Sequence, residues 1–563
     1  MATERKAATP AREFTDFTVA AERVDARRIR VSVPTSPAGA LRPGITTSFP
    51  EAEVRALRDS FRVSVTGAGR AHITSGETTA IGKRLSEALL PPAVFHHLER
   101  SLAKVTRAGG GGVRIRLALP PSLIDLPWEY LYRPDRSEHT GVSGFLLFDP
   151  ALSLVRLKPK RGIRPTPIDG RQRLNFVGTF WEGRVDGWEV WREFDQLRRG
   201  LKPVERYISA EFAVASDLDV FDEGIERDTA IFHYAGHVDF DAEGRAYCIR
   251  ELPRSFDLGA ARKILVRDIA RTLRRTDTRV VVMSACNSGF WPAVQPLVDA
   301  GVPVVIGLNG AVESTSTIEF CTRLYEALGL GMGVDEAVGV ARRASMEWGA
   351  RHGLFDWGLY MVYAQTADAV LFPRTQTAAV ATKQKAVRRQ HEAEIGRSVR
   401  RVRELDGMNF GEILSRTVER RVLILGRFSA RRLPVLQAIK DRLAEHKNGY
   451  LPELFTFKRP DSRDLVESIV GFATMSRFII ADLSEPRSIP QELQAIVPAL
   501  QSVPVVPIIN EGGREFATFS ALARRPNVAQ PTLRYKNVED LAAKLDEVIV
   551  PIAEGLKKQL QPH

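Results

Sequence analysis

Two segments of the chain each end an apolar run with a residue that can do chemistry. The segment "TAIFHYAGH" ends at His237, and "RVVVMSAC" ends at Cys286, which stands 49 positions later (286 − 237). A thiol is mostly protonated at neutral pH, and a neighbouring imidazole raises the fraction of the nucleophilic thiolate. The histidine can then protonate the leaving amine of a cleaved amide. The pair is therefore a candidate for a nucleophile and its general base.

The same residue types are also compatible with a metal site or with an inert core. His233, His237 and Cys286 could supply three zinc ligands, but no CxxC or HExxH spacing accompanies them, and we predict no metal. His233 lies inside its apolar run, so we expect a hydrogen-bonded core histidine that supports the site. We interpret Cys248 and Cys321 as buried thiols, the latter within the helical pattern "IEFCTRLYEAL".

The two runs must be strands for the pair to meet. Both are short and apolar and alternate with helical patterns, as in a parallel sheet, where ligands bind at the carboxyl ends of the strands. Gly236 leaves its backbone N–H open to the close approach of a reacting carbonyl oxygen. Asp239 and Glu313 are candidate acidic walls of a pocket for a Lys or Arg side chain.

Bulk composition favours a multidomain protein of the cytoplasm. The chain has 563 residues, 44% hydrophobic and 26% charged, which predicts about three or four domains. Three cysteines cannot build a disulfide framework, so a reducing compartment is expected. No apolar run reaches the ~18 residues of a membrane span, and the charged start "MATERKAATPAREF" does not resemble a signal peptide.

Pattern changes divide the chain into four regions. Residues 1–80 contain the strand-like stretches "RIRVSV" and "SFRVSV", and either complete the next domain or form a separate substrate-recruiting module. Residues 81–372 alternate strand and helix patterns, which predicts an α/β domain with a mostly parallel sheet flanked by helices. A basic helical linker is expected over 373–420. Residues 421–563 repeat the alternation and predict a second, smaller Rossmann-like α/β domain.

The net charge of +12 is concentrated in one part of the chain. Residues 383–432 hold 14 Lys/Arg and 6 Asp/Glu, a difference of +8 (14 − 6). Apolar residues recur there at helical spacing, which predicts a basic amphipathic helix over 385–405. It packs on a neighbouring domain, or contacts phosphate or a partner helix. No zinc finger, helix-turn-helix or aromatic-rich nucleic-acid face accompanies it, so we do not expect direct nucleic-acid binding.

Residues 80–372 resemble the CHAT family of caspase-like proteases. The resemblance rests on "IGKRLSEALLPPAVFHHLERSLAKV", "LPWEYLY", "FHYAGH", "VVVMSACNSG", "GVPVVIGLNGAV" and "FCTRLYEALGLGMGVDEAVGVARRA". It implies a caspase-like fold with His237 as base, Cys286 as nucleophile, and the N–H groups of Gly236 and Cys286 as the oxyanion hole. The family commonly has glycine after the second histidine, whereas Val238 stands here, and a β-branched residue restricts that backbone position.

The C-terminal region carries a second group of candidate residues. In "RVLILGRFSARR", Gly426, Arg427 and Ser429 stand between a strand and a helix, where anions can bind. The stretch "RFIIADLSEPRSIPQELQAIVPAL" resembles TIR-like and nucleoside deoxyribosyltransferase-like domains, and this resemblance implies a nucleotide pocket containing Asp482, Ser484 and Glu492. Glu492 is equally typical of a first helical turn, where the helix dipole favours an acid.

Together these features predict a ligand-gated cysteine endopeptidase, of the kind that serves as a bacterial antiphage or conflict effector. Binding of a nucleotide or NAD-derived signal by the TIR-like domain would activate it, with formation of a homo-oligomer. Catalysis itself needs no cofactor, the substrates are proteins, and no membrane contact is expected. One alternative is a TIR-like enzyme that cleaves NAD or a nucleoside beside a scaffold CHAT domain. The other is a nonenzymatic adaptor, if Val238 disables the dyad.

Overall fold

The computed structural model of the chain contains two compact units. The first comprises Met1–Ala350 and Leu354–Asp406, and the second comprises Arg351–Gly353 and Gly407–His563. The structure describes residues 14–62, 75–133, 144–163, 167–168, 170–181, 188–215, 221, 225–252, 261–310, 312, 314–352, 354–366, 369–372, 420–427, 432–446, 448, 450–454, 473–474, 476–485 and 489–560. Glu313, Ser429 and the predicted basic helix over 385–405 lie outside these described residues.

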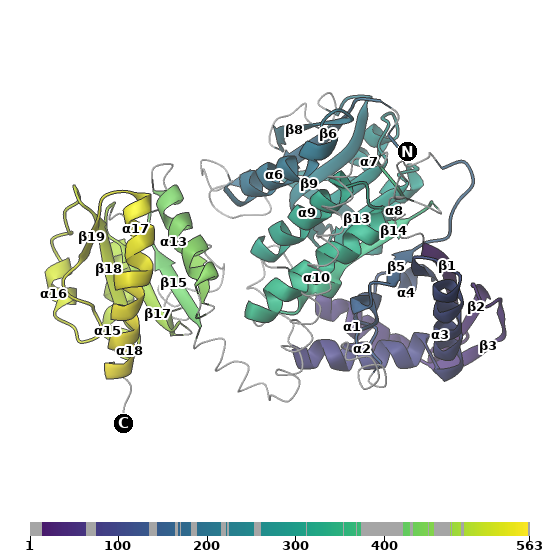
Figure 1. Ribbon diagram of the computed structural model, residues 1–563, viewed down its shortest axis with the longest axis horizontal. Helices are drawn as coiled ribbons and strands as arrows, with labels where there is room; N and C mark the ends of the chain where they lie inside the picture. The colour runs from purple at the N-terminus through teal and green to yellow at the C-terminus, as the bar shows by residue number, and fades with distance from the viewer. Residues whose placement is uncertain are drawn as a thin grey trace, which may run out of the picture. The chain divides into compact units, whose positions relative to one another are not determined.

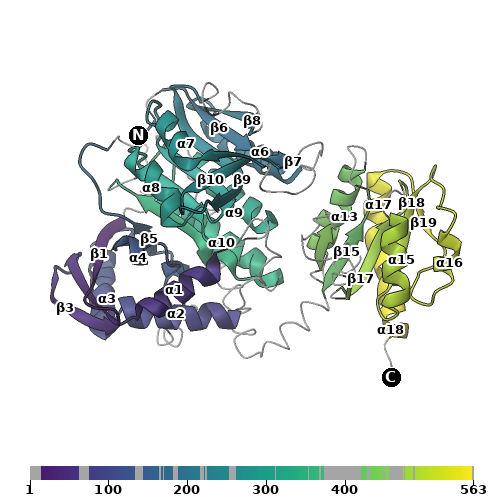
Figure 2. The same ribbon diagram turned by 180° about the vertical axis from the view of Figure 1, so that it is seen from behind.

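The first unit is built on one large sheet (Figures 1 and 2). Its strands are β1 (Phe14–Arg23), β2 (Arg28–Thr35), β3 (Leu41–Ser48), β4 (Gly112–Ala118), β5 (Leu152–Arg156), β6 (Gln172–Gly178), β7 (Phe180–Trp181), β8 (Ile208–Val214), β9 (Thr229–Phe240), β10 (Ala246–Leu252), β11 (Arg262–Leu265), β12 (Val280–Cys286), β13 (Val304–Leu308) and β14 (Tyr360–Ala364). The main path runs β11-β10-β9-β12-β13-β14-β5-β4-β1-β2-β3, with β6 beside β9. Central pairs such as β9–β12 and β12–β13 are parallel. The predicted α/β class with a mostly parallel sheet is confirmed.

Helices cover both faces of this sheet (Figures 1 and 2). They are α1 (Glu51–Phe61), α2 (Ser75–Leu89), α3 (Pro92–Arg107), α4 (Pro121–Ile124), α6 (Trp188–Leu201), α7 (Val266–Leu273), α8 (Trp291–Asp299), α9 (Ser314–Gly329) and α10 (Val334–His352). Successive strand residues point to opposite faces, so Val281 packs in the core with α7 and α8, whereas Val282 packs in the core with α6, α9 and α10. Burial on both faces explains why the strands are continuous apolar runs.

The N-terminal region belongs to this sheet. Strand β1 pairs in parallel with β4 and antiparallel with β2, which places residues 14–48 in the first compact unit. The expectation of a strand in "SFRVSV" is wrong for its first two residues, because Ser60 and Phe61 end helix α1. The residues from 63 lie outside the described part of the chain. The acidic first turn of α1, with Glu51 and Glu53, favours the helix there.

The motif "LPWEYLY" forms a buried polar centre in the first unit. The carboxylate of Glu129, fully buried, accepts hydrogen bonds from Arg156 at 2.6 and 2.8 Å and from Arg342 at 3.0 Å. Tyr130 donates to the carbonyl of Phe355 at 2.6 Å. These contacts connect the segment before β5 to helix α10 and to β5 itself, so the motif organises the fold.

The second unit is a smaller, doubly wound α/β domain, which confirms the predicted second sheet. Its strands are β15 (Arg421–Leu425), β16 (Leu451–Leu454), β17 (Phe478–Asp482), β18 (Val505–Asn510) and β19 (Leu533–Tyr535), and its helices include α13 (Leu433–Glu445), α15 (Ile489–Ala499), α16 (Phe519–Ala523), α17 (Val538–Lys544) and α18 (Val550–Leu560). All strand pairs are parallel, in the order β16-β15-β17-β18-β19. Helices α13, α17 and α18 cover one face, and α15 and α16 cover the other (Figures 1 and 2).

Among the helices that the structure describes, none is both long enough and apolar enough to cross a bilayer.

Candidate active site

His237 and Cys286 lie side by side on neighbouring strands. They are register partners in the last paired row of β9 and β12. Register partners on adjacent parallel strands are about 4.8 Å apart and direct their side chains to the same face. Both residues are partly exposed. The structure therefore brings the two predicted residues together where a substrate can reach them.

The position of His237 within its strand differs from the expectation. Cys286 ends β12 as predicted, but β9 continues past His237 to Phe240. The extension arises because Val238–Phe240 pair with β10 as an antiparallel hairpin. A turn closes this hairpin, with Gly244 at φ +76°, a conformation that glycine adopts without strain. His237 thus lies where the parallel pairing of β9 with β12 ends and its antiparallel pairing with β10 begins.

A sharp turn follows the nucleophile. Asn287 is one of the described non-glycine residues with positive φ, at 64°, which asparagine tolerates better than most residues. Its side-chain amide donates to the carbonyl of Val238 at 3.2 Å, so it connects the loop after Cys286 to the residue after His237. Ser288 continues the turn. Its hydroxyl donates to the carbonyl of Met283 and accepts from the N–H of Leu308, both at 2.9 Å.

The hydroxyl of Tyr234 fixes the backbone of the histidine. It accepts from the His237 N–H at 3.1 Å and from the Thr179 hydroxyl at 2.9 Å, and it lies 2.8 Å from the carbonyl of Ile249, to which it can donate. Tyr234 is completely buried, and burial raises the pKa of its phenol well above the usual range. The hydroxyl therefore stays protonated and keeps these bonds across the neutral pH range.

Gly236 has no room for a side chain. A Cβ built there would lie 2.4 Å from Thr179 Oγ1 and 2.6 Å from Tyr234 Oη. Gly236→Ala is therefore expected to displace both hydroxyls, to lower the melting temperature, and to reduce the alkylation rate of Cys286 several-fold. Gly76→Ala, where a Cβ meets nothing within 4 Å, is the control. Equal melting temperatures and alkylation rates for both variants would contradict this account of Gly236.

Val238 fits its position without strain. It is buried in the extended strand β9, opposite Cys248 of β10, and it is not among the described residues with positive φ. A β-branched side chain is compatible with extended backbone. The departure from the family's glycine therefore does not distort the backbone beside His237.

The three cysteines have different environments. Burial raises the pKa of the Cys248 thiol, and burial together with Glu193 raises that of Cys321, whereas Cys286 is partly exposed. Brief treatment of the folded chain with iodoacetamide at pH 7 is therefore expected to label Cys286 alone, as read by peptide mass spectrometry. Labelling of Cys248 or Cys321 at a comparable rate would contradict the assignment of these thiols to the core.

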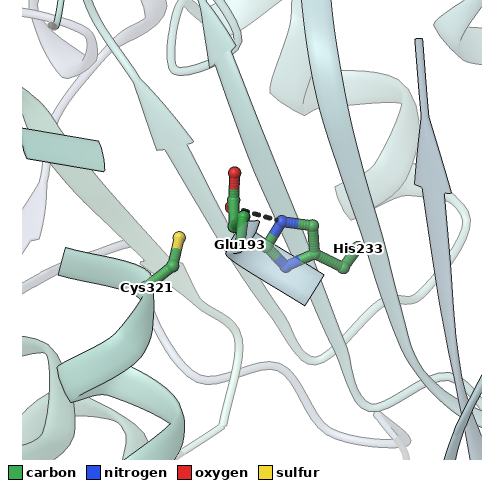
Figure 3. A group of neighbouring side chains, drawn as sticks. All are labelled: Glu193, His233 and Cys321. Carbon is green, nitrogen blue, oxygen red and sulfur yellow. Dashed lines mark hydrogen bonds and ion pairs between the residues drawn. The ribbon is translucent and has the colours of Figure 1, made fainter. Parts of the chain in front are cut away.

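His233 belongs to a buried polar cluster with Glu193 and Cys321 (Figure 3). Its Nε2 lies 2.9 Å from Glu193 Oε1, its Nδ1 lies 2.8 Å from the Tyr325 hydroxyl, and its ring stacks on Phe176. The side chains of Glu193, His233 and Cys321 each offer a ligand atom, all within 4.8 Å of one another. Direct bonding between Glu193 and His233 uses the atoms that a cation would need, so hydrogen bonding accounts for this cluster.

The second unit gathers its candidate residues at the carboxyl edge of its sheet. Asp482 ends β17 and is buried in an ion pair with Arg432, and it accepts from the Ser484 hydroxyl at 2.6 Å. Arg427, after β15, forms a 2.8 Å ion pair with Glu485, after β17. In a sheet of this strand order the crevice between those two strands is the expected ligand site.

The other two predicted residues of this edge have clear packing environments. A Cβ at Gly426 would meet Leu436 of α13 at 2.4 Å, so glycine lets this helix approach. Glu492 lies in the first turn of α15 and is 7% exposed. Its carboxylate is thus at the amino end of a helix, where the dipole stabilises it.

Comparison with known proteins identifies the class of the first unit. Residues 79–365, about half of the chain, match the model of the CHAT domain. The chain therefore belongs to the CHAT domain family, and this membership supports the caspase-like protease part of the prediction. No curated protein matches the chain.

Two solved structures resemble the chain weakly. They are crystal structures of the separase–securin complex of Saccharomyces cerevisiae at 2.6 and 3.0 Å resolution. Each is 10% identical, with TM-scores of 0.34 and 0.32 and coverage of 63% and 62% of this chain. The match spans 30% of the length of the matched chain in each structure.

Sequence reasoning missed two residues that form hydrogen bonds beside the dyad. Glu193 lies on the same stripe of α6 as Val190 and Leu197, and a carboxylate within an apolar stripe is a signal for a buried polar partner. Asn287 directly follows the nucleophile, and asparagine is enriched at positions with positive φ. Both signals are present in the sequence.

Proposed function

We propose that the chain is a caspase-like cysteine endopeptidase. The observation that carries the proposal is the placement of His237 and Cys286 as register partners on β9 and β12, inside the segment that matches the CHAT domain. The Cys286 thiolate attacks the peptide carbonyl carbon and forms a thioester, while His237 gives a proton to the leaving amine. Water then attacks the thioester, with His237 as base, and restores the thiol.

The surroundings of the dyad support this chemistry. The N–H groups of Gly236 and Cys286 are the proposed donors to the oxyanion of the tetrahedral intermediate. Asp239 is two residues beyond His237 in β9 and therefore projects from the same face, as a candidate acidic wall for a Lys or Arg side chain.

The second unit is proposed to control the protease. Its candidate nucleotide site, of TIR-like type, lies at the carboxyl edge of the sheet around Arg427, Asp482 and Ser484. Binding of a nucleotide or NAD-derived signal there would lead to a homo-oligomer in which protein substrates reach the dyad. Control of this kind suits an antiphage or conflict effector in the cytoplasm, because an unregulated protease would damage its own cell.

The test is proteolysis by the full chain with and without a panel of NAD-derived and cyclic nucleotides. Substrates are a cell lysate and a peptide library. The proposal expects cleavage with one nucleotide only, abolished in Cys286→Ala. Cleavage that persists in Cys286→Ala, or no cleavage with any nucleotide, would overturn the proposal.

A second candidate function is cleavage of NAD or a nucleoside by the second unit, with Glu492 as the reacting carboxylate. The partial exposure of Arg427 and the burial of Glu492 at the same sheet edge favour it. On our proposal, purified wild-type protein and Glu492→Ala leave NAD unconsumed alike, as measured by chromatography. Consumption by the wild type that is lost in Glu492→Ala would transfer the activity to this unit.

A further inference from the structure

A buried carboxylate contacts both strands that carry the dyad. Glu193 of α6 is 5% exposed, and its two oxygens have separate partners. Oε1 is 2.9 Å from His233 Nε2, and Oε2 accepts from the Ser284 hydroxyl at 3.1 Å. Figure 3 shows the first of these contacts, with Cys321 beside it. One side chain thus bonds to two strands at once.

These two strands are the ones that carry the dyad. His233 precedes His237 by four residues in β9, and Ser284 precedes Cys286 by two residues in β12. Side chains alternate along a strand, so all four residues project from the same face of the sheet. Ala235 and Ser284 are register partners, and each lies two residues before its member of the dyad. The Glu193 bridge therefore fixes β9 against β12 on the dyad's own face.

His233, at one end of this bridge, has two further contacts. His233 stacks on Phe176 with ring centroids 4.5 Å apart, and its Nδ1 lies 2.8 Å from the Tyr325 hydroxyl. Among the described residues, Glu193 is paired with this histidine. Burial of a carboxylate costs free energy unless it is hydrogen-bonded, so the bonds to His233 and Ser284 compensate for the burial of Glu193.

We propose that Glu193 is a positioning residue, whose carboxylate sets the register of β9 against β12 so that the His237 imidazole meets the Cys286 thiol. The inference rests on the proposed function, because it assigns the dyad a supporting bridge. It requires that loss of the bridge separates the imidazole from the thiol. The pKa of the thiol then rises toward that of free cysteine, about 8.5.

The test is the pH dependence of Cys286 alkylation by iodoacetamide, measured on the full-length chain by mass spectrometry. This readout needs neither substrate nor activating ligand. Glu193→Leu fills the same space without hydrogen bonds, and is expected to raise the midpoint of alkylation by about one pH unit. Ser284→Ala removes one half of the bridge and keeps the carboxylate, and is expected to raise the midpoint as well. Asp195→Asn, on the exposed side of the same helix, is the control.

Glu193→Gln distinguishes the effect of the hydrogen-bonded bridge from the effect of the negative charge. Its amide can still bond to both partners, while the loss of a negative charge favours a thiolate nearby. The midpoint should therefore stay at or below the wild-type value. If charge alone mattered, Leu and Gln would shift the midpoint in the same direction, which would overturn the inference.

The outcomes also separate this inference from the proposed function. If wild-type Cys286 titrates like free cysteine, the dyad itself fails. If wild-type Cys286 titrates well below free cysteine and both Glu193→Leu and Ser284→Ala leave the midpoint unchanged, the bridge has no positioning role and the proposed dyad stands. Should Glu193→Leu fail to fold, Ser284→Ala decides alone.

Discussion

Cys286→Ala is expected to abolish proteolysis, with a loss on the order of 10³-fold or more in cleavage rate. Without the thiol there is no atom at the end of β12 that can form the thioester, and His237 has no nucleophile to activate. The measurement is the rate of appearance of peptide fragments in the presence of the proposed activating nucleotide. Nucleotide binding, followed by the rise in melting temperature, should be unchanged, because Cys286 belongs to the first unit and the proposed nucleotide site to the second.

The matched control is Cys248→Ala. This cysteine lies on β10, buried, opposite Val238, and burial raises its pKa, so it has no part in the proposed reaction. Cleavage should be retained within a few-fold. Equal loss in both variants would mean that the effect is on folding, and retained cleavage in Cys286→Ala would exclude this residue as nucleophile.

Glu129→Gln is expected to destabilise the first unit by about 3–5 kcal/mol, the cost of removing one partner from a buried ion network. Glu129 is the shared acceptor of Arg156 and Arg342, and both guanidiniums are buried. Burial and the neighbouring charge of Arg156 already lower the pKa of Arg342 to about 10. Without the carboxylate, two cations remain in the core with no counter-charge between them.

The chain offers a clean readout for this prediction. All seven tryptophans lie between Trp128 and Trp357, so tryptophan fluorescence during urea unfolding reports on the first unit alone. Glu22→Gln removes the exposed ion pair with Arg30 and should leave the midpoint unchanged. A midpoint for Glu129→Gln that equals that of Glu22→Gln would contradict the role assigned to the network.

The main strands could be predicted from sequence because their physical signal is local. The runs that became β9 and β12 are apolar, and the β12 run begins with three consecutive valines, as is typical of strands buried on both faces. The extension of β9 beyond His237 has a local signal too, in the turn that contains Gly244, but the parallel-strand pattern outweighed it. The helix that ends at Phe61 was mistaken for a strand because its last residues join an alternating stretch.

Charged residues were harder to place, because their partners are distant in the sequence. Arg432 and Asp482 are 50 positions apart, and Arg432 is buried against Asp482. Glu193 and Ser284 are 91 positions apart. Such pairs form only when the sheet is assembled, so the apolar stripe of α6 can mark Glu193 as buried, but periodicity and composition do not identify its partners.

The most direct test of the central claim is covalent trapping of the dyad. Peptidyl chloromethyl ketones ending in Lys, Arg or Asp would be incubated with the full chain and the nucleotide panel, and adducts located by mass spectrometry. Attack by the thiolate forms a thioether and releases chloride. Our account predicts an adduct on Cys286, dependent on the activating nucleotide and strongly reduced in His237→Ala. No adduct on Cys286, or equal labelling in His237→Ala, would contradict it.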